Sequence, residues 1–160
     1  MTSNAAFMLL AMLAQPSIAQ SELPVWHGPA LFCGYASHIQ LESDETIEPG
    51  DVGIHTGNFL WSGPWGSAAV TDIEWASRPI SIVRAMGNLG PYTLYRLVPG
   101  EHRQIRYALG DEPNHLAAYV GSTQFTGGRH DLDILRRIRL KRPEESDGDG
   151  CRYRMMLVVQ

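Results

Sequence analysis

The sequence predicts a mainly β fold, namely a single-domain antiparallel β-sandwich, with a small closed β-barrel as the alternative. Short apolar runs alternate with turn residues along the chain, and long apolar stripes of helical period are absent. The 16 glycines and 10 prolines are spread through all 160 residues. About eight short strands with turns roughly every 8–12 residues are typical of both architectures.

The N-terminus predicts export. Residues 5–14 form an unbroken apolar run of about the length of a signal-peptide core, whereas a membrane span needs roughly 20 residues. Ser17 and Ala19 are the small residues that a signal peptidase requires before its cleavage site. We therefore expect a signal peptide over 1–19 and one disulfide-stapled β domain over 20–160. No Lys or Arg precedes the run, so a disordered or core-packed N-terminal segment is the alternative.

Hydropathy and net charge, together with the expected signal peptide, indicate the location of the protein and the partners to exclude. Beyond the N-terminal run, no stretch is apolar for long enough to span a bilayer, so we expect no transmembrane segment in the mature chain. A periplasmic or secreted location follows from the expected signal peptide. The net charge of −4 is mildly acidic, which argues against a nucleic-acid-binding protein.

The two cysteines, Cys33 and Cys151, lie near opposite ends of the expected mature chain. In an oxidising compartment such a pair favours one disulfide. A bridge closing a loop of this length removes roughly 5 kcal/mol of unfolded-chain entropy. A reactive thiol or a metal ligand is the alternative, but neither cysteine has a second Cys or a His at metal-site spacing. The bridge predicts that the first and last strands lie near each other.

Strands are expected wherever the apolar alternation runs between turn signals. The expected strands cover residues 30–41, two short stretches of 46–55 around a Pro49-Gly50-Asp51 turn, 69–75, 79–85, 92–98 and 103–109. The last two should form a hairpin around Pro99-Gly100-Glu101. Residues 57–66 are rich in glycine and aromatic residues and are expected to form a loop, and residues 87–91 a turn.

The C-terminal third contains the candidate helix and a candidate hairpin. Residues 111–121 could form one short helix, capped by Asp111 and ended by Gly121, with a strand over 116–125 as the competing interpretation. Apolar and polar residues alternate through most of 132–141 and again through 151–159. These two stretches predict a β-hairpin with one solvated face.

We expect neither a metal nor another cofactor. None of the six histidines is paired with another at the spacing that places two imidazoles on one face: His27, His38, His55, His102, His115 and His130. The acidic stretch with Glu144, Glu145, Asp147 and Asp149 could trap a cation weakly. It lacks regular ligand spacing, and a solvated loop explains these residue types equally well.

Two surfaces are candidate binding sites. Phe59, Trp61 and Trp65 could stack on sugar rings or bury into another protein, unless their rings fold back over the end of the sandwich. The expected C-terminal hairpin carries cations that could hold an anionic glycan, a lipid headgroup or an acidic partner: Arg137, Arg139, Lys141, Arg152 and Arg154. An ordinary solvated sheet face, balanced by nearby carboxylates, is the alternative for this second set.

These features favour a non-enzymatic binding or accessory protein of the cell envelope, with an envelope glycan or another envelope protein as the partner. A small secreted hydrolase with a site assembled between strands is the alternative. No catalytic residue is assigned, because the chain has no Gly-x-Ser-x-Gly motif. The adjacent His130 and Asp131 would point to opposite faces of a strand.

Overall fold

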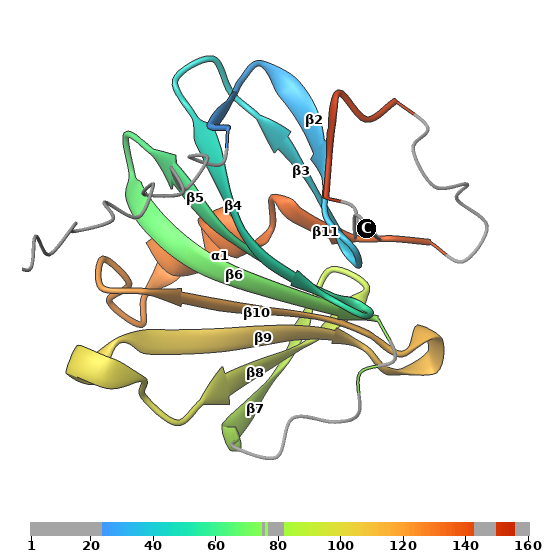
Figure 1. Ribbon diagram of the computed structural model, residues 1–160. Coiled ribbons are helices and arrows are strands. Elements are labelled where there is room, and N and C mark those ends of the chain that lie inside the picture. The colour runs from blue at the N-terminus through green and yellow to red at the C-terminus, as the bar shows by residue number, and fades with distance from the viewer. Residues whose placement is uncertain (1–23, 75, 77–81, 143–149, 156–160) are drawn as a thin grey trace, which may run out of the picture.

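Two β-sheets pack face to face in the computed structural model, which describes residues 24–74, 76, 82–142 and 150–155 (Figure 1). The larger sheet has eight strands in the spatial order β1-β4-β5-β6-β10-β9-β8-β7. In that order the strands are Trp26–His27, Thr46–Gly53, Thr56–Gly63, Gly66–Glu74, Leu116–Ser122, Ile105–Asp111, Tyr92–Leu97 and Ile82–Leu89. All seven pairings in this sheet are antiparallel.

The smaller sheet has four strands in the order β11-β3-β2-β12. These are Ile138–Leu140, Ser37–Leu41, Ala30–Cys33 and Tyr153–Arg154. One α-helix, α1, spans Arg129–Leu135, and two 3-10 turns lie at Glu101–Arg103 (η1) and Glu112–Asn114 (η2). No helix among the described residues is long and apolar enough to cross a membrane.

The core lies between the inner faces of the two sheets. Phe32 of β2 meets Phe59 of β5 edge-on, with ring centroids 4.6 Å apart. Trp61 of β5 and Tyr107 of β9 are fully buried in the same cluster. The larger sheet ends at β1 on one side and β7 on the other, so the described strands form a sandwich and not a closed barrel. The predicted β-sandwich is therefore confirmed.

The predicted disulfide is also confirmed. Cys33 ends β2 and Cys151 lies just before β12; the two are separated by 118 positions in sequence, and their Cα atoms are 5.8 Å apart. Beyond the bridge, β12 runs parallel to β2, with Tyr153 beside Phe32. The two ends of the described chain therefore lie side by side, as the cysteine spacing predicted.

Residues 30–41 form a hairpin of β2 and β3, and not the single strand that the alternation predicted. The turn between the strands is held from the opposite sheet by Asp72 of β6. Oδ2 of Asp72 accepts hydrogen bonds from the backbone N–H groups of Ala36 and Ser37, at 3.0 and 2.9 Å, and from Ser37 Oγ at 2.8 Å. A Cβ on Gly34 would collide with this carboxylate, which explains the glycine. Such a tertiary contact leaves no mark in a local pattern.

Asp72 is fully buried, and its second oxygen, Oδ1, has no hydrogen-bond partner among the described residues. Burial raises the pKa of Asp72 above the ordinary 3.8, against the three hydrogen bonds, and the charge of Glu74 raises the pKa further. The folded protein therefore holds this proton more tightly than the unfolded chain does. The resulting stability is fully present below about pH 3.8 and is lost as the pH rises through the folded-state pKa.

Replacement of this carboxyl by an amide tests its role. We expect Asp72→Asn to be at least as stable as the wild type at pH 7, because an amide oxygen can accept the same three hydrogen bonds without a buried charge. Asp72→Ala should lower the free energy of unfolding by about 2–3 kcal/mol, because it leaves two buried backbone donors unpaired. Urea unfolding between pH 4 and pH 8 measures both. Equal losses for Asn and Ala would contradict this role.

Two other predictions in the N-terminal half are wrong. Pro49-Gly50-Asp51 is not a turn but lies within β4, where the pairing with β5 shifts register between Pro49 and Val52. A bulge tolerates a proline, because the missing N–H is not needed in the ladder there. Residues 57–66 are not a loop, because β5 covers Thr56–Gly63 and pairs on both sides. Glycine is typical of loops, so the glycines in this stretch favoured the prediction of a loop over a strand.

The short helix predicted near 111–121 is wrong, because only Glu112–Asn114 form a 3-10 turn and β10 follows it; the competing strand interpretation of 116–125 is the better one. The predicted terminal hairpin is wrong. Residues 129–135 form α1, and β11 and β12 lie on opposite edges of the smaller sheet with β3 and β2 between them. The hairpin predicted for 92–98 and 103–109 is confirmed by the pairing of β8 with β9.

The start of α1 is organised by Asp131, which is fully buried. Its carboxylate accepts hydrogen bonds from the backbone N–H groups of Thr126 and Gly127, at 3.1 and 2.7 Å, and from Tyr107 Oη at 2.8 Å. Burial and this hydrogen bond raise the pKa of Tyr107 to about 12. The predicted signal peptide, the acidic residues of 143–149 and the ends of the predicted strands 79–85 and 151–159 lie outside the described residues.

Candidate functional site

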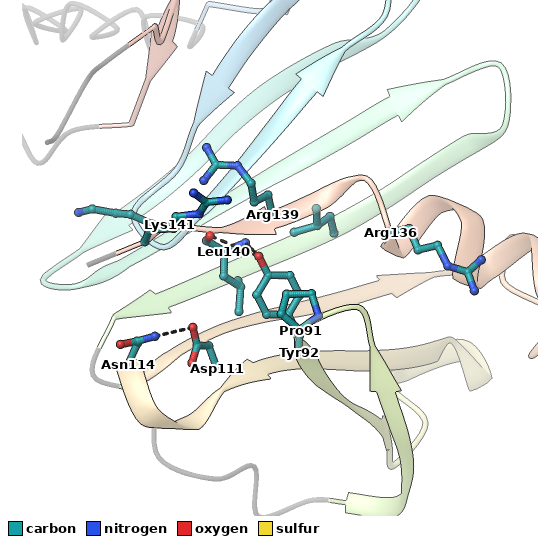
Figure 2. Close-up of a pocket in the computed structure, with 10 residues that line it drawn as sticks. Pro91, Tyr92, Asp111, Asn114, Arg136, Arg139, Leu140 and Lys141 are labelled. Atoms are coloured by element: carbon teal, nitrogen blue, oxygen red, sulfur yellow. Dashed lines mark hydrogen bonds between the residues drawn. The ribbon is translucent and has the colours of Figure 1, made fainter. Parts of the chain in front are cut away.

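A groove of about 570 Å³ runs between β11, the β7–β8 turn and η2 (Figure 2). Four cations line the groove: Arg136, Arg139, Lys141 and Arg142. Pro91, Tyr92 and Leu140 supply apolar surface. A smaller hollow of about 290 Å³ shares Pro91, Tyr92 and Arg136 with the groove and so continues it. Both hollows are open to solvent, and the lining of the groove combines cations with apolar surface.

Backbone and side-chain contacts hold the walls of the groove in place. Tyr92 Oη accepts a hydrogen bond from the backbone N–H of Leu140 at 3.0 Å, which ties β8 to β11 across the sandwich (Figure 2). On another wall, Asn114 Nδ2 donates to Asp111 Oδ2 at 2.8 Å. The first contact joins two chain segments that are distant in sequence, whereas the second is local to η2. The groove is therefore a property of the folded domain.

The cations of the groove also have protein partners. Lys141 Nζ lies 3.1 Å from Glu74 Oε1, and Arg139 Nη2 lies 2.6 Å from His38 Nδ1. Arg136 pairs with Asp133 at 2.7 Å, one turn away on the surface. More than half of each side chain in the Arg136–Asp133 pair is exposed, and exposed pairs are worth only about 0–1 kcal/mol. An anionic ligand can therefore compete for Arg136 at little cost.

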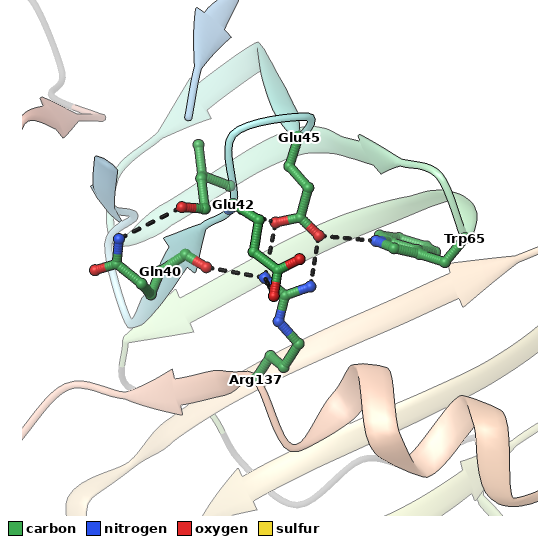
Figure 3. Close-up of polar contacts among 6 residues, drawn as sticks. Gln40, Glu42, Glu45, Trp65 and Arg137 are labelled. Atoms are coloured by element: carbon green, nitrogen blue, oxygen red, sulfur yellow. Dashed lines mark hydrogen bonds and ion pairs between the residues drawn. The ribbon is translucent and has the colours of Figure 1, made fainter. Parts of the chain in front are cut away.

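Arg137 lies next to the groove in sequence but is engaged elsewhere. Its guanidinium forms a two-pronged contact with Glu45, with Nη1–Oε1 and Nη2–Oε2 distances of 2.5 and 2.7 Å (Figure 3). Nη2 also donates to the backbone carbonyl of Gln40, and the guanidinium stacks over the ring of Trp61. Trp65 Nε1 donates to the same carboxylate of Glu45 at 3.0 Å.

This cluster shifts the protonation of both charged groups. Burial alone would raise the pKa of Glu45, but hydrogen bonds from Arg137, the Glu42 backbone and Trp65, together with the Arg137 charge, hold it below its usual 4.5. The same contact raises the pKa of Arg137. The pair clamps the β3–β4 turn onto the segment between α1 and β11 (Figure 3). Arg137 is thus part of an internal contact.

The other predicted site residues lie at separate places. Phe59 and Trp61 point inward from β5, with 4% and 0% of their surface exposed, so the alternative in which these rings fold into the sandwich is the better one. Trp65 is half-buried in the β5–β6 turn, edge-on to Trp61. Arg152 stacks on Tyr153 and Arg154 lies in β12, on the edge of the smaller sheet opposite β11.

Of the predicted cations, the structure brings Arg139 and Lys141 to one groove. The predicted site did not include Arg136 and Arg142, which flank β11, or Tyr92 on the facing wall. The clustering of cations over residues 136–142 was a usable signal, whereas nothing local to Tyr92 predicted that it would face them. The chain matches no family model, no curated protein and no solved structure.

Proposed function

We propose that this protein is an exported, non-enzymatic binding protein of the cell envelope that holds an anionic glycan in the groove beside β11. The observation that carries the proposal is the composition of the lining, with four cations around an apolar surface. Guanidinium and ammonium groups bind carboxylates and phosphates through charge-assisted hydrogen bonds. The ring of Tyr92 and the flat face of Pro91 can pack against a sugar ring.

The shape of the groove supports an extended ligand over a small ion. The groove and the hollow that continues it lie along several residues of β11 and the preceding segment, and both are open to solvent. Cations before, within and after β11 could each meet one acidic group of a repeating glycan. A periplasmic or secreted location agrees with the disulfide and with the expected signal peptide. The secreted hydrolase stays an alternative prediction.

Binding of defined oligosaccharides tests this function. We expect the folded, oxidised protein to bind oligogalacturonate, with affinity falling as salt rises, and to bind a neutral gluco-oligosaccharide of equal length far more weakly. Arg136→Gln and Arg142→Gln should each weaken the acidic ligand about tenfold, since one hydrogen bond to a charged group is worth about 1.5–3 kcal/mol. Isothermal titration calorimetry measures both effects.

Arg152→Gln is the matched control, because Arg152 is an exposed arginine beyond the opposite edge of the smaller sheet. It should bind like the wild type. Equal losses of affinity in the Arg152 and Arg136 variants would attribute the effect to net charge and contradict binding in the groove. If the protein binds vesicles that contain phosphatidylglycerol but not the oligosaccharide, the ligand is a lipid headgroup and not a glycan.

A further inference from the structure

Three chemically active side chains cross the smaller sheet in one row. The strand register places Cys33 of β2 opposite His38 of β3, and His38 opposite Arg139 of β11. The disulfide adds Cys151 at one end of this row. One ligand atom each from Cys33, His38 and Cys151 lie within 4.8 Å of one another. The row lies on the face opposite the core, because Phe32 and Ile39, the neighbours of Cys33 and His38 in the chain, point inward.

This arrangement is compact because of cross-strand pairing, and sequence spacing does not reveal it. His38 is five positions after Cys33, which matches no helical or single-strand ligand spacing. Cys33 and His38 are buried and Cys151 is half-buried, so the three groups are largely shielded from bulk water. Two cysteine sulfurs and one histidine imidazole are a ligand set that is known from zinc sites.

We propose that reduction of the disulfide turns this row into a metal site, in which Cys33, Cys151 and His38 bind one zinc-class ion. In the oxidised form the sulfurs are bonded to each other and offer no thiolate. A dithiol reductant supplies two electrons and two protons, giving two thiols and its own disulfide. Metal binding then displaces the two thiol protons. Thiolate and imidazole donors select zinc over calcium or magnesium.

The distances suit this ion. Zinc lies about 2.3 Å from sulfur and about 2.0 Å from nitrogen, so tetrahedral ligand atoms are separated by about 3.3–3.8 Å. A group already within 4.8 Å needs only side-chain rotation to reach these separations once the sulfurs are free to move apart. Three protein ligands leave a fourth position for water or another ligand.

Arg139 sets the state of the imidazole before the metal binds. A guanidinium has no acceptor, so His38 Nδ1 accepts the 2.6 Å contact and the proton of a neutral ring lies on Nε2. Metal binding must either displace Arg139 from Nδ1 or move the ring proton. Arg139 therefore orients His38 in the disulfide form and gives way in the metal form. Because only reduced cysteines offer thiolates, the oxidation state of Cys33 and Cys151 determines whether the metal can bind.

Cobalt(II) titration of the full chain, reduced and kept anaerobic, tests the proposal without any glycan, so its outcome is separate from that of the groove. We expect one cobalt ion per chain, with thiolate charge-transfer and tetrahedral visible bands that zinc abolishes. The disulfide form should give no bands. His38→Gln should lose intensity in the visible bands and bind about tenfold more weakly or worse. His130→Gln, on α1, is the control and should behave as the wild type.

Several results would overturn the site. Equal spectra and affinity for His38→Gln and the wild type would remove His38 from the ligands, and absence of the bands in the reduced wild type would remove the site altogether. Unfolding in urea gives a second measurement, which remains informative if reduction partly unfolds the chain. One equivalent of zinc should raise the urea midpoint of the reduced wild type and not that of Cys33→Ser. A wild-type midpoint that does not move would equally overturn the proposal.

Discussion

Replacing Cys33 and Cys151 together by serine is expected to lower the free energy of unfolding by about 2–5 kcal/mol. The bridge joins residues 118 apart, and a loop of that length gives an upper figure of about 5 kcal/mol in the chain-entropy model. The loss should arise in the unfolded chain, which becomes free to expand. Most small domains have only about 5–15 kcal/mol of total stability, so this change takes a large share.

Urea unfolding of the double variant and of the oxidised wild type measures this effect. The wild type reduced by a dithiol and blocked by alkylation is a further comparison, although its bulkier side chains add a packing cost. The serine variant should retain its near-UV circular dichroism in buffer if its remaining stability is positive. A loss well below 1 kcal/mol would show that the unfolded chain is already compact around these two ends.

Arg137→Met is expected to lower the free energy of unfolding by about 3 kcal/mol. Glu45 has no exposed side-chain surface, and Arg137 supplies two of its hydrogen bonds as well as the neutralising charge. Breaking a buried ion pair by removing one partner is costly because the other charge stays behind. About a quarter of the Arg137 side chain is exposed, so water can partly reach Glu45 in the variant. This partial hydration limits the loss to about 3 kcal/mol.

The pH dependence and two companion variants check the cause. The pKa of Glu45 is lowered on folding, so its contribution is present above about pH 4.5 and is lost as the pH falls through the folded-state pKa. Arg137→Met should weaken this dependence. Adding Glu45→Gln to Arg137→Met should recover part of the loss, since no charge is then buried. Arg136→Met is the control and should change stability by at most about 0.5 kcal/mol.

Alternation and spacing were enough to predict the sandwich and its bridge. Strands such as β8 and β9 carry their signal locally, because a turn with proline and glycine separates two short stretches rich in apolar residues. The disulfide needed only the number of cysteines and the expected compartment. These features depend on short stretches of chain or on composition, and both are visible in one sequence.

The misplaced elements depend on contacts between distant segments. Asp72 bends residues 34–37 from the opposite sheet, and Asp131 starts α1 with help from Tyr107 of β9. A local pattern contains no information about either partner. In residues 57–66 the glycines suggested a loop, but strand pairing on both sides overrode that preference and turned Phe59 and Trp61 inward.

The candidate site was predictable only in part for the same reason. Arg139 and Lys141 were identified from the cationic stretch, but the groove exists only because β8 and η2 meet β11 in the fold. Arg137 belongs to the same stretch and faces Glu45, which lies 92 residues earlier. Charge in the sequence therefore identified the segment and could not separate the internal cation from those that line the groove.

The covalent ring formed by Cys33 and Cys151 also determines the outcome of proteolytic cleavage. A single backbone cut anywhere from residue 34 to residue 150 leaves both pieces joined, so they cannot diffuse apart. Among the described residues, the exposed turns at Ile54–His55 and η1 lie inside this ring and are accessible to such cuts. A nicked molecule would run as one band on a non-reducing gel and as two after reduction. A single proteolytic cut could thus leave the groove beside β11 assembled.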